Sequence, residues 1–165
     1  IHRGVDVARA TGTPHIAAAV GATSEGLVRR LYDLPDTALI DMGDFAGGLL
    51  KYLRRHPVPK LTIAGGFAKM SKLAQGHLDL HSGRSQVDTA VLAALLEEAG
   101  AEPGLVAKAR GANTALDVLR MADGYRLGDR IAEAAKRSAV EALRGAEVEI
   151  EIVVSDREGR LVGRS

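Results

Sequence analysis

The sequence has 165 residues, 46% of them hydrophobic and 26% charged, and a formal net charge of +1, which fits one domain with a full core and argues against nucleic acid as a partner. It contains no cysteine, which excludes disulfides, thiolate metal sites and a thiol nucleophile and fits a cytoplasmic protein. No uncharged apolar run approaches the ~18 residues of a membrane-spanning helix, so we expect no membrane partner.

The first half of the chain alternates helix patterns with short apolar segments of strand length. Ile1, Val5 and Ala8 recur at helical spacing, and because Ile1 already stands inside this pattern we expect the chain to be part of a longer protein. The expected helices cover 1–11, the stretch from a cap at Thr23 or Ser24 to Pro35, the stretch from a cap at Asp44 to Arg55, and the stretch between Gly66 and Gly76. The expected strands cover 15–20, 37–40 and 61–64.

These strands follow a regular spacing, with starts near residues 15, 37 and 60, and each is followed by a glycine-bearing loop and a helix. Such spacing is typical of βα units, whose crossover connections imply parallel strands with helices on both faces of the sheet. The loops after parallel strands gather at one edge of the sheet, where ligands bind. We therefore expect the loops 21–25, 41–44 and 65–67 to face a common hollow.

The second half of the chain predicts further helices and a final ribbon. Helices are expected over 87–99, 114–121 and 129–144, the second opened by a capping box, and 102–111 is expected to be a connection that is strandlike at Leu105 and Val106. Residues 148–152 alternate between apolar and charged, which predicts a strand with one wet face that folds back through 156–159 as an antiparallel hairpin. The predicted fold is α/β: a parallel sheet core of three or more strands with helices on both faces, plus a C-terminal antiparallel hairpin, in a single domain.

Glycine-rich turns follow all three early strands. They can present backbone N–H groups to an anion or let a cofactor lie against bare backbone, although tight βα turns need glycine for their own geometry. None matches the dinucleotide fingerprint G-x-G-x-x-G or the phosphate-loop pattern. Gly47 and Gly48, inside an expected helix, either admit another backbone or a ligand or fill a tight core. Asp41 ends the second strand with no helix to cap, so it is the acid that we favour as a ligand contact.

Two lysines and a histidine loop follow the third strand. Lys69 and Lys72 share one helix face and can hold substrate carboxylates, although a solvated helix face is the commoner explanation. His81 is a candidate general base or substrate contact, and its alternative role is to anchor its loop. Ser82 is not on a nucleophile elbow, so a hydrolase triad is not favoured. His77 and His81 lack a third ligand nearby, so we expect no metal site.

Residues 65–76 read GGFAKMSKLAQG and are followed by His81-Ser82 and Asp88. This stretch resembles the central motif of the CbiD family, in which Gly-x-x-x-Lys-x-x-Lys-Leu-Ala-x-Gly leads into a His-Ser loop and an aspartate. Residues 3–8 and 21–25 upstream and the Asp-Arg-x-Gly turn at 156–159 match the family in the same order, so the resemblance spans nearly the whole chain.

The resemblance implies S-adenosylmethionine-dependent methylation of cobalt-precorrin-5B at ring carbon 1 in cobalamin biosynthesis. It also implies that the chain is the C-terminal part of a longer two-domain enzyme, whose N-terminal half supplies part of the pocket, and that this part alone is inactive. The methyl donor is inferred from the resemblance alone, because no glycine motif of the common methyltransferases is present.

Motif match and strand-end position together suggest the site residues. The expected catalytic residues are His81, Ser82 and Asp44, and the expected tetrapyrrole contacts are Lys69, Lys72, Arg84 and Asp88. The expected donor contacts are Gly21, Thr23, Glu25, Asp41, Gly43, Gly65 and Gly66. Two alternatives stay open: a ligand-binding domain without catalysis, and a dinucleotide-dependent enzyme on a Rossmann-like sheet.

Overall fold

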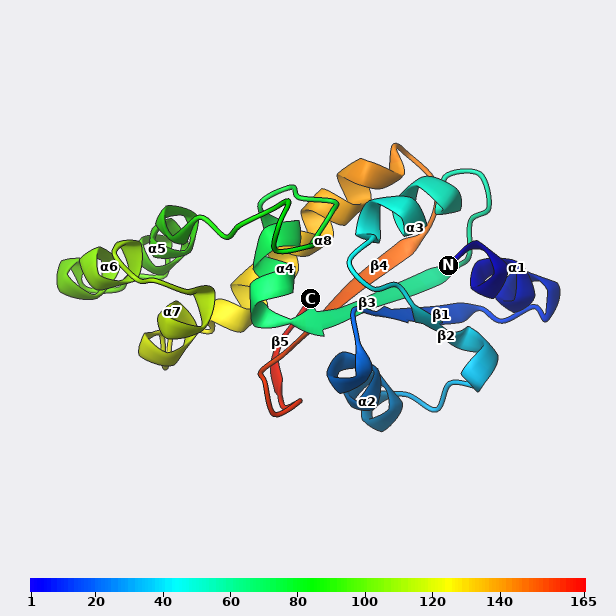
Figure 1. Ribbon diagram of the computed structural model, residues 1–165, viewed down its shortest axis with the longest axis horizontal. Helices are drawn as coiled ribbons and strands as arrows, with labels where there is room; N and C mark the ends of the chain where they lie inside the picture. The colour runs from blue at the N-terminus through cyan, green and yellow to red at the C-terminus, as the bar shows by residue number, and fades with distance from the viewer.

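A computed structural model describes all 165 residues and contains one five-stranded sheet in the order β2-β1-β3-β4-β5 (Figure 1). The strands are β1 (His15–Ala19), β2 (Leu39–Asp41), β3 (Lys60–Gly66), β4 (Glu149–Ser155) and β5 (Leu161–Arg164). The first four are parallel, and β5 runs antiparallel to β4. The predicted α/β fold, with a parallel core and a C-terminal antiparallel hairpin, is confirmed.

Helices cover both faces of this sheet. They are α1 (His2–Ala10), α2 (Ala22–Leu31), α3 (Ala46–Leu53), α4 (Phe67–Ala74), α5 (Thr89–Glu98), α6 (Pro103–Arg110), α7 (Ala115–Met121) and α8 (Leu127–Leu143). Figure 1 shows α3, α4 and α8 on one face and α2 on the other. The core is divided accordingly: 36 buried residues form the cluster that includes α3, α4 and α8, and five lie between α2 and the sheet. None of the helices has the length and apolar character needed to cross a bilayer.

The last parallel strand differs from its prediction. The alternation over 148–152 predicts one wet face, yet every residue of β4 after Glu149 is buried. The reason is its place between β3 and β5, where Glu151 is only 5% exposed and accepts hydrogen bonds from Tyr32, Thr62 and Arg164. A charged residue that finds several donors can be buried, so alternation alone did not distinguish a wet face from a bonded one.

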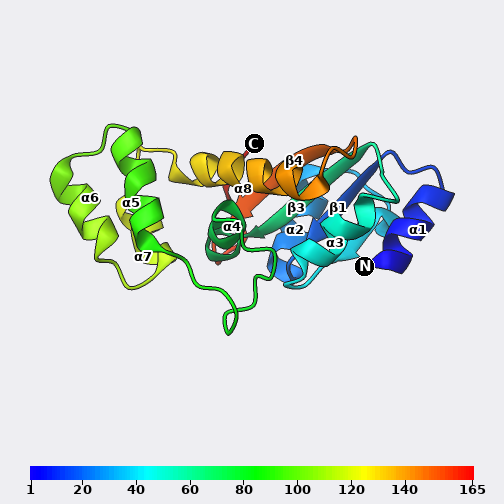
Figure 2. The same ribbon diagram turned by 90° about the horizontal axis from the view of Figure 1, so that it is seen from above.

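The connection predicted over 102–111, strandlike at Leu105 and Val106, is wrong. These residues form helix α6, which starts with Pro103 in its first turn. Proline suits that position because it has no N–H to leave unpaired and its φ angle is already helical. With α5 and α7, this helix makes a lobe, residues 89–121, that projects away from the sheet (Figure 2).

Two helix caps differ from prediction and one agrees with it. Helix α2 begins at Ala22 with Gly21 as its N-cap, and Ser24 accepts from the Gly21 N–H from inside the first turn. Asp44 does not cap α3, because its carboxylate pairs instead with Lys69. The capping box at Thr114 is confirmed at the start of α7.

The two glycines of α3 have different surroundings. A Cβ on Gly47 would lie 2.9 Å from Leu78 Cβ, and the Gly47 N–H donates to the Leu78 carbonyl at 2.9 Å. Gly48 has no comparably close neighbour. Gly47 therefore lets another stretch of backbone approach the helix, which is one of the two roles expected for this pair.

Candidate functional site

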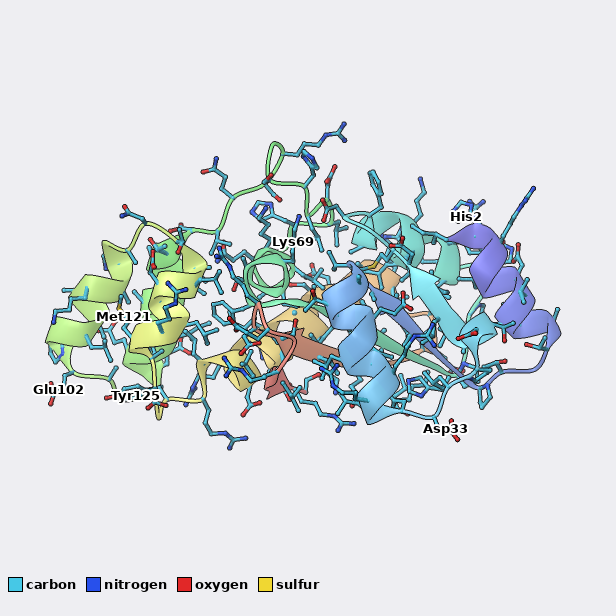
Figure 3. All side chains as sticks on the ribbon, turned by 60° about the horizontal axis from the view of Figure 1, so that its bottom comes forward. His2, Asp33, Lys69, Glu102, Met121 and Tyr125 are labelled. Carbon is cyan, nitrogen blue, oxygen red and sulfur yellow. The ribbon has the colours of Figure 1, made fainter.

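A cleft with a volume of about 400 Å³ opens at the carboxyl edge of the sheet. The loops after β1, β3 and β4, the first turns of α2 and α4, and one residue of α7 form its walls. The lining residues are Val20, Gly21, Ala22, Thr23, Ser24, Gly66, Phe67, Ala68, Lys69, Leu116, Ser155, Asp156 and Arg157. In Figure 3, Lys69 lies on α4, in the middle of the molecule between the lobe and α2.

The strand order explains why the cleft lies here. Strand β1 lies between β2 and β3. After β1 the chain therefore forms β2 on one side of β1 and then β3 on the other side. Helices α2 and α4, which follow β1 and β3, consequently pack on opposite faces of the sheet (Figure 1). Such a reversal of strand order separates the two loops at the carboxyl edge and makes the crevice where ligands bind in open α/β sheets.

Gly66 keeps the floor of the cleft open. Ala64 of β3 and Val153 of β4 face α2, and two residues further along each strand Gly66 and Ser155 are on the same face and in register with each other. A Cβ built on Gly66 meets no atom within 4 Å. The missing side chain therefore leaves Ser155 beside open space.

Ser155 is the one buried side chain in the protein whose polar atom has no hydrogen-bond partner. It is 1% exposed, lines the cleft, and its Oγ accepts no bond and donates none. Burying a hydroxyl without a partner is unfavourable, and most buried polar groups in folded proteins are paired.

Two helices direct their N-terminal ends at the cleft. The N-caps of α2 and α4 are Gly21 and Gly66, and neither has a side-chain cap. First-turn N–H groups have no partner within their own helix, and the helix dipole adds partial positive charge at this end. The backbone here therefore favours an anionic group.

Among the charged side chains at the cleft, the unpaired Arg157 adds to this preference. The Lys69 ammonium donates to Asp44 Oδ1 at 2.7 Å and to the Leu80 carbonyl at 2.9 Å, while Arg157 is exposed and forms no ion pair. The only lining carboxylate, Asp156, pairs with Arg160 at 2.6 Å. Burial raises the pKa of Asp156, but the hydrogen bonds from Arg160 outweigh burial and hold that pKa below its usual value.

Comparison with known proteins agrees with the motif in α4. The family model described as the C-terminal domain of CbiD matches residues 79–165, which is more than half of the chain. The chain belongs to the CbiD family. The predicted family resemblance is thereby confirmed.

Curated relatives of this CbiD chain share the name cobalt-precorrin-5B C(1)-methyltransferase. The protein of Bradyrhizobium is 61% identical over 99% of this chain and 44% of its own length. The proteins of Paramagnetospirillum magneticum and Brucella anthropi are 58% and 57% identical over 99% of this chain and 46% and 45% of their own lengths. The chain thus spans less than half the length of these relatives. No solved structure matches it.

The expected donor contacts of the CbiD chain divide into two groups. Gly21, Thr23 and Gly66 line the cleft. The other four residues do not line the cleft: Glu25, Asp41, Gly43 and Gly65.

The four residues outside the cleft lining have other contacts. Glu25 pairs with Arg29, and Asp41 accepts from the N–H of Gly43. A Cβ on Gly65 would lie 2.6 Å from Met70 Cε and 3.0 Å from Val20 Cγ2, so this glycine packs against these two side chains. The expected hollow is therefore shared by the loops after β1, β3 and β4. The loop after β2 lies outside it because β2 is the outermost strand.

The two lysines of α4 occupy different environments. Lys69 lines the cleft, whereas Lys72 is 6% exposed and donates to the Leu80 carbonyl at 3.0 Å. Burial, with a contribution from the charge of Lys69, lowers the pKa of Lys72. A solvated helix face does not describe Lys72, and both ammonium groups hold the backbone of the loop that follows α4.

Four of the remaining expected site residues, His81, Ser82, Arg84 and Asp88, lie in the segment between α4 and α5, and Asp44 lies between β2 and α3; none of them lines the cleft. The N–H of Gly83 donates to His81 Nδ1 at 3.1 Å, and Arg84 pairs with Asp79. Asp88 caps α5 by accepting from the Ala90 N–H. The catalytic roles of His81, Ser82 and Asp44 and the substrate contacts of Arg84 and Asp88 stay predictions. No three histidine or carboxylate side chains come together as metal ligands.

Ser155 and Arg157 were missed by sequence reasoning. The predicted strand ends at residue 152 and belongs to a C-terminal hairpin, so the sequence assigns no site role to Ser155, and Arg157 enters only through the family match of the turn 156–159. The available signal was the run Val153-Val154-Ser155-Asp156, in which a polar pair directly follows a buried strand. Had β4 been recognised as parallel to β3, Ser155 would have been expected beside Gly66.

Proposed function

We propose that this CbiD chain is part of an S-adenosylmethionine-dependent enzyme that methylates cobalt-precorrin-5B at ring carbon 1, and that its carboxyl-edge cleft holds the methyl donor. The names of the curated relatives support the reaction. The position of the cleft, where the strand order reverses, is the observation that carries the assignment of the ligand site.

The size of the cleft favours the donor over the tetrapyrrole. A volume of about 400 Å³ is within the range of small-molecule pockets. It suits a nucleoside-sized ligand and is too small to enclose a tetrapyrrole macrocycle with its peripheral groups. We therefore propose that the tetrapyrrole lies at the mouth of the cleft, and that the rest of the longer enzyme covers it.

The residues of the cleft would act mainly by positioning. The donor supplies an electrophilic methyl group, and in the reaction its S–CH₃ bond breaks as the bond to the ring carbon forms, which leaves S-adenosylhomocysteine. Gly21 and Gly66 would let the donor lie close to the backbone, Thr23 would contact it beside them, and Lys69 would stand at its edge. Fixing the two reactants in line supplies much of the rate gain of such a displacement.

Filling the cleft tests this proposal. In the full-length enzyme, Gly66→Leu adds a side chain where a Cβ meets no atom within 4 Å, so the fold is retained apart from a cost of about 1 kcal/mol at the N-cap of α4. Calorimetric titration should show an affinity for S-adenosylhomocysteine that is at least about tenfold weaker, because the ligand and the leucine compete for the same space.

Gly104→Leu is the matched control for this experiment. Gly104 is an exposed residue of α6 that also has open space at its Cβ, but it lies in the lobe, outside the cleft lining. The control should bind S-adenosylhomocysteine like the wild type. Unchanged affinity in a folded Gly66→Leu enzyme would refute the placement of the donor.

A parallel titration with NADH separates the alternative functions. The methyltransferase proposal predicts binding of S-adenosylhomocysteine and none of NADH. Binding of NADH alone would indicate a dinucleotide-dependent enzyme. Binding of S-adenosylhomocysteine by a full-length enzyme that transfers no methyl group to cobalt-precorrin-5B would indicate a ligand-binding protein without this activity.

A further inference from the structure

We propose that Ser155 is a ligand-binding residue, and that its hydroxyl, together with the N-terminal end of α2, binds a carboxylate in the cleft. This inference rests on the proposed function only for the source of the carboxylate. It adds a named contact on β4, a strand from which the sequence suggested no site residue.

The unpaired hydroxyl is the first observation. Ser155 Oγ is buried and lacks a partner although hydrogen-bonding groups surround the cleft. Alanine would fill nearly the same space without leaving a hydroxyl unsatisfied. A ligand oxygen that accepts from this hydroxyl would give it the partner that the protein does not provide.

The position of Ser155 at the cleft is the second observation. It is in register with Gly66, whose missing side chain leaves open space on the face that carries α2. Gly21, Ala22 and Thr23 line the same cleft with first-turn backbone of a ten-residue helix. Ser155 and the first turn of α2 thus line the same cleft.

The donor set and the charges favour a carboxylate. A carboxylate has two oxygens, so one can accept from Ser155 while the other accepts from backbone N–H groups, and hydrogen bonds to an ionised acceptor are the stronger kind. Arg157, which forms no ion pair, contributes positive charge at the cleft, whereas Lys69 is paired with Asp44. The negative charge of Asp156 opposes this positive charge only weakly, because Arg160, four residues further along the chain, pairs with the Asp156 carboxylate.

Two sources can supply the carboxylate. One is the amino-acid end of the methyl donor, and the other is a peripheral carboxylate of the tetrapyrrole. The chemistry at Ser155 is the same in both, and titration of the full-length enzyme with three compounds distinguishes them. These are S-adenosylhomocysteine, 5′-methylthioadenosine, which lacks the amino-acid carboxylate, and cobalt-precorrin-5B.

The test is Ser155→Ala in the full-length enzyme. With the donor as source, the variant should bind S-adenosylhomocysteine about tenfold more weakly and 5′-methylthioadenosine as well as the wild type does. With the tetrapyrrole as source, only cobalt-precorrin-5B should bind about tenfold more weakly. Without ligand, the melting temperature of the variant should equal or exceed that of the wild type, because the lost hydroxyl was unpaired.

Ser71→Ala is the matched control. Ser71 is fully buried as well, but its hydroxyl donates to the Phe67 carbonyl inside α4. This variant should leave all three affinities unchanged.

The proposal is overturned if Ser155→Ala weakens neither S-adenosylhomocysteine nor cobalt-precorrin-5B, or if it weakens 5′-methylthioadenosine as much as S-adenosylhomocysteine. If the wild type does not bind S-adenosylhomocysteine, the donor placement fails. The cobalt-precorrin-5B titration then decides by itself whether Ser155 binds a carboxylate.

Discussion

Glu151 shows how a single residue of β4 links distant parts of the chain. Its carboxylate accepts from Tyr32 at 2.6 Å, from Thr62 at 2.9 Å and from Arg164 at 2.6 Å. Tyr32 follows α2, Thr62 lies in β3 and Arg164 ends β5, so one carboxylate connects three elements. Burial raises the pKa of Glu151, but the hydrogen bonds outweigh burial and lower it to about 2. Burial also raises the pKa of Tyr32 to about 12, helped by its bond to Glu151.

The low pKa of Glu151 predicts an acid-sensitive contribution to stability. The unfolded pKa is near 4.5 and the folded pKa about 2, so the contribution is fully present above the first value and is lost as the pH falls toward the second. Its size is on the order of 3 kcal/mol. In urea titrations between pH 5 and 2.5, the free energy of unfolding should fall more steeply for the wild type than for Glu151→Gln.

Glu149→Gln serves as the control for this prediction, because Glu149 is in the same strand with a side chain that is 67% exposed and pairs only with Lys60. Its pH dependence should follow that of the wild type. Equal slopes for the wild type and Glu151→Gln would contradict the role given to Glu151.

At the scale of elements, β5 and α8 pack backbone against backbone. A Cβ on Gly128 would collide with the Val162 carbonyl, and one on Gly163 would collide with the carbonyl of Gly128. The Arg164 N–H also donates to Asp129 at 3.0 Å. The first turn of α8 thereby covers β5, which would otherwise present an open edge of the sheet.

This close packing predicts that Gly128→Ala is destabilising. Alanine is about 1 kcal/mol better than glycine in a helix interior, but at this position it must displace the backbone of β5, so we expect a net loss of about 2–3 kcal/mol. Gly104→Ala, in an open position of α6, should instead be neutral or stabilising. Chemical denaturation of both variants checks the pair, and a stabilising Gly128→Ala would mean that α8 and β5 do not pack this closely.

At the scale of the whole molecule, the sheet with its flanking helices carries the lobe α5–α7 at one end (Figure 2). Helix α6 packs on α5 and α7, and α7 also packs on α4. Leu116 of α7 reaches the cleft, so the lobe supplies part of the wall around the proposed ligand site.

The position of α6 predicts that its amides exchange with solvent before those of the sheet. Its contacts are with two short helices, so it can open without disrupting the five-stranded sheet. In native-state hydrogen exchange, amides of α6 should show an opening free energy below that of β3 and a weaker dependence on denaturant. Identical opening free energies and denaturant dependence for α6 and β3 would show that the lobe and the sheet unfold as one unit.

The sequence alone determined most of the elements, although not α6, and also the α/β class and the family. Apolar periodicity and turn residues act over a few neighbours, so they located β1, β2, β3, α8 and the hairpin. The motif around Lys69 and Lys72 indicated the CbiD family for the same reason, because it is a continuous stretch.

Only the tertiary structure decided which strand ends form the cleft. Strand order results from crossovers and packing between distant segments, and these placed β1 between β2 and β3 and β4 beside β3. That order removed Asp41 from the cleft lining and brought Ser155 into it. Burial, which depends on the whole fold, likewise gave Lys72 and Glu151 internal partners where local pattern predicted contact with solvent.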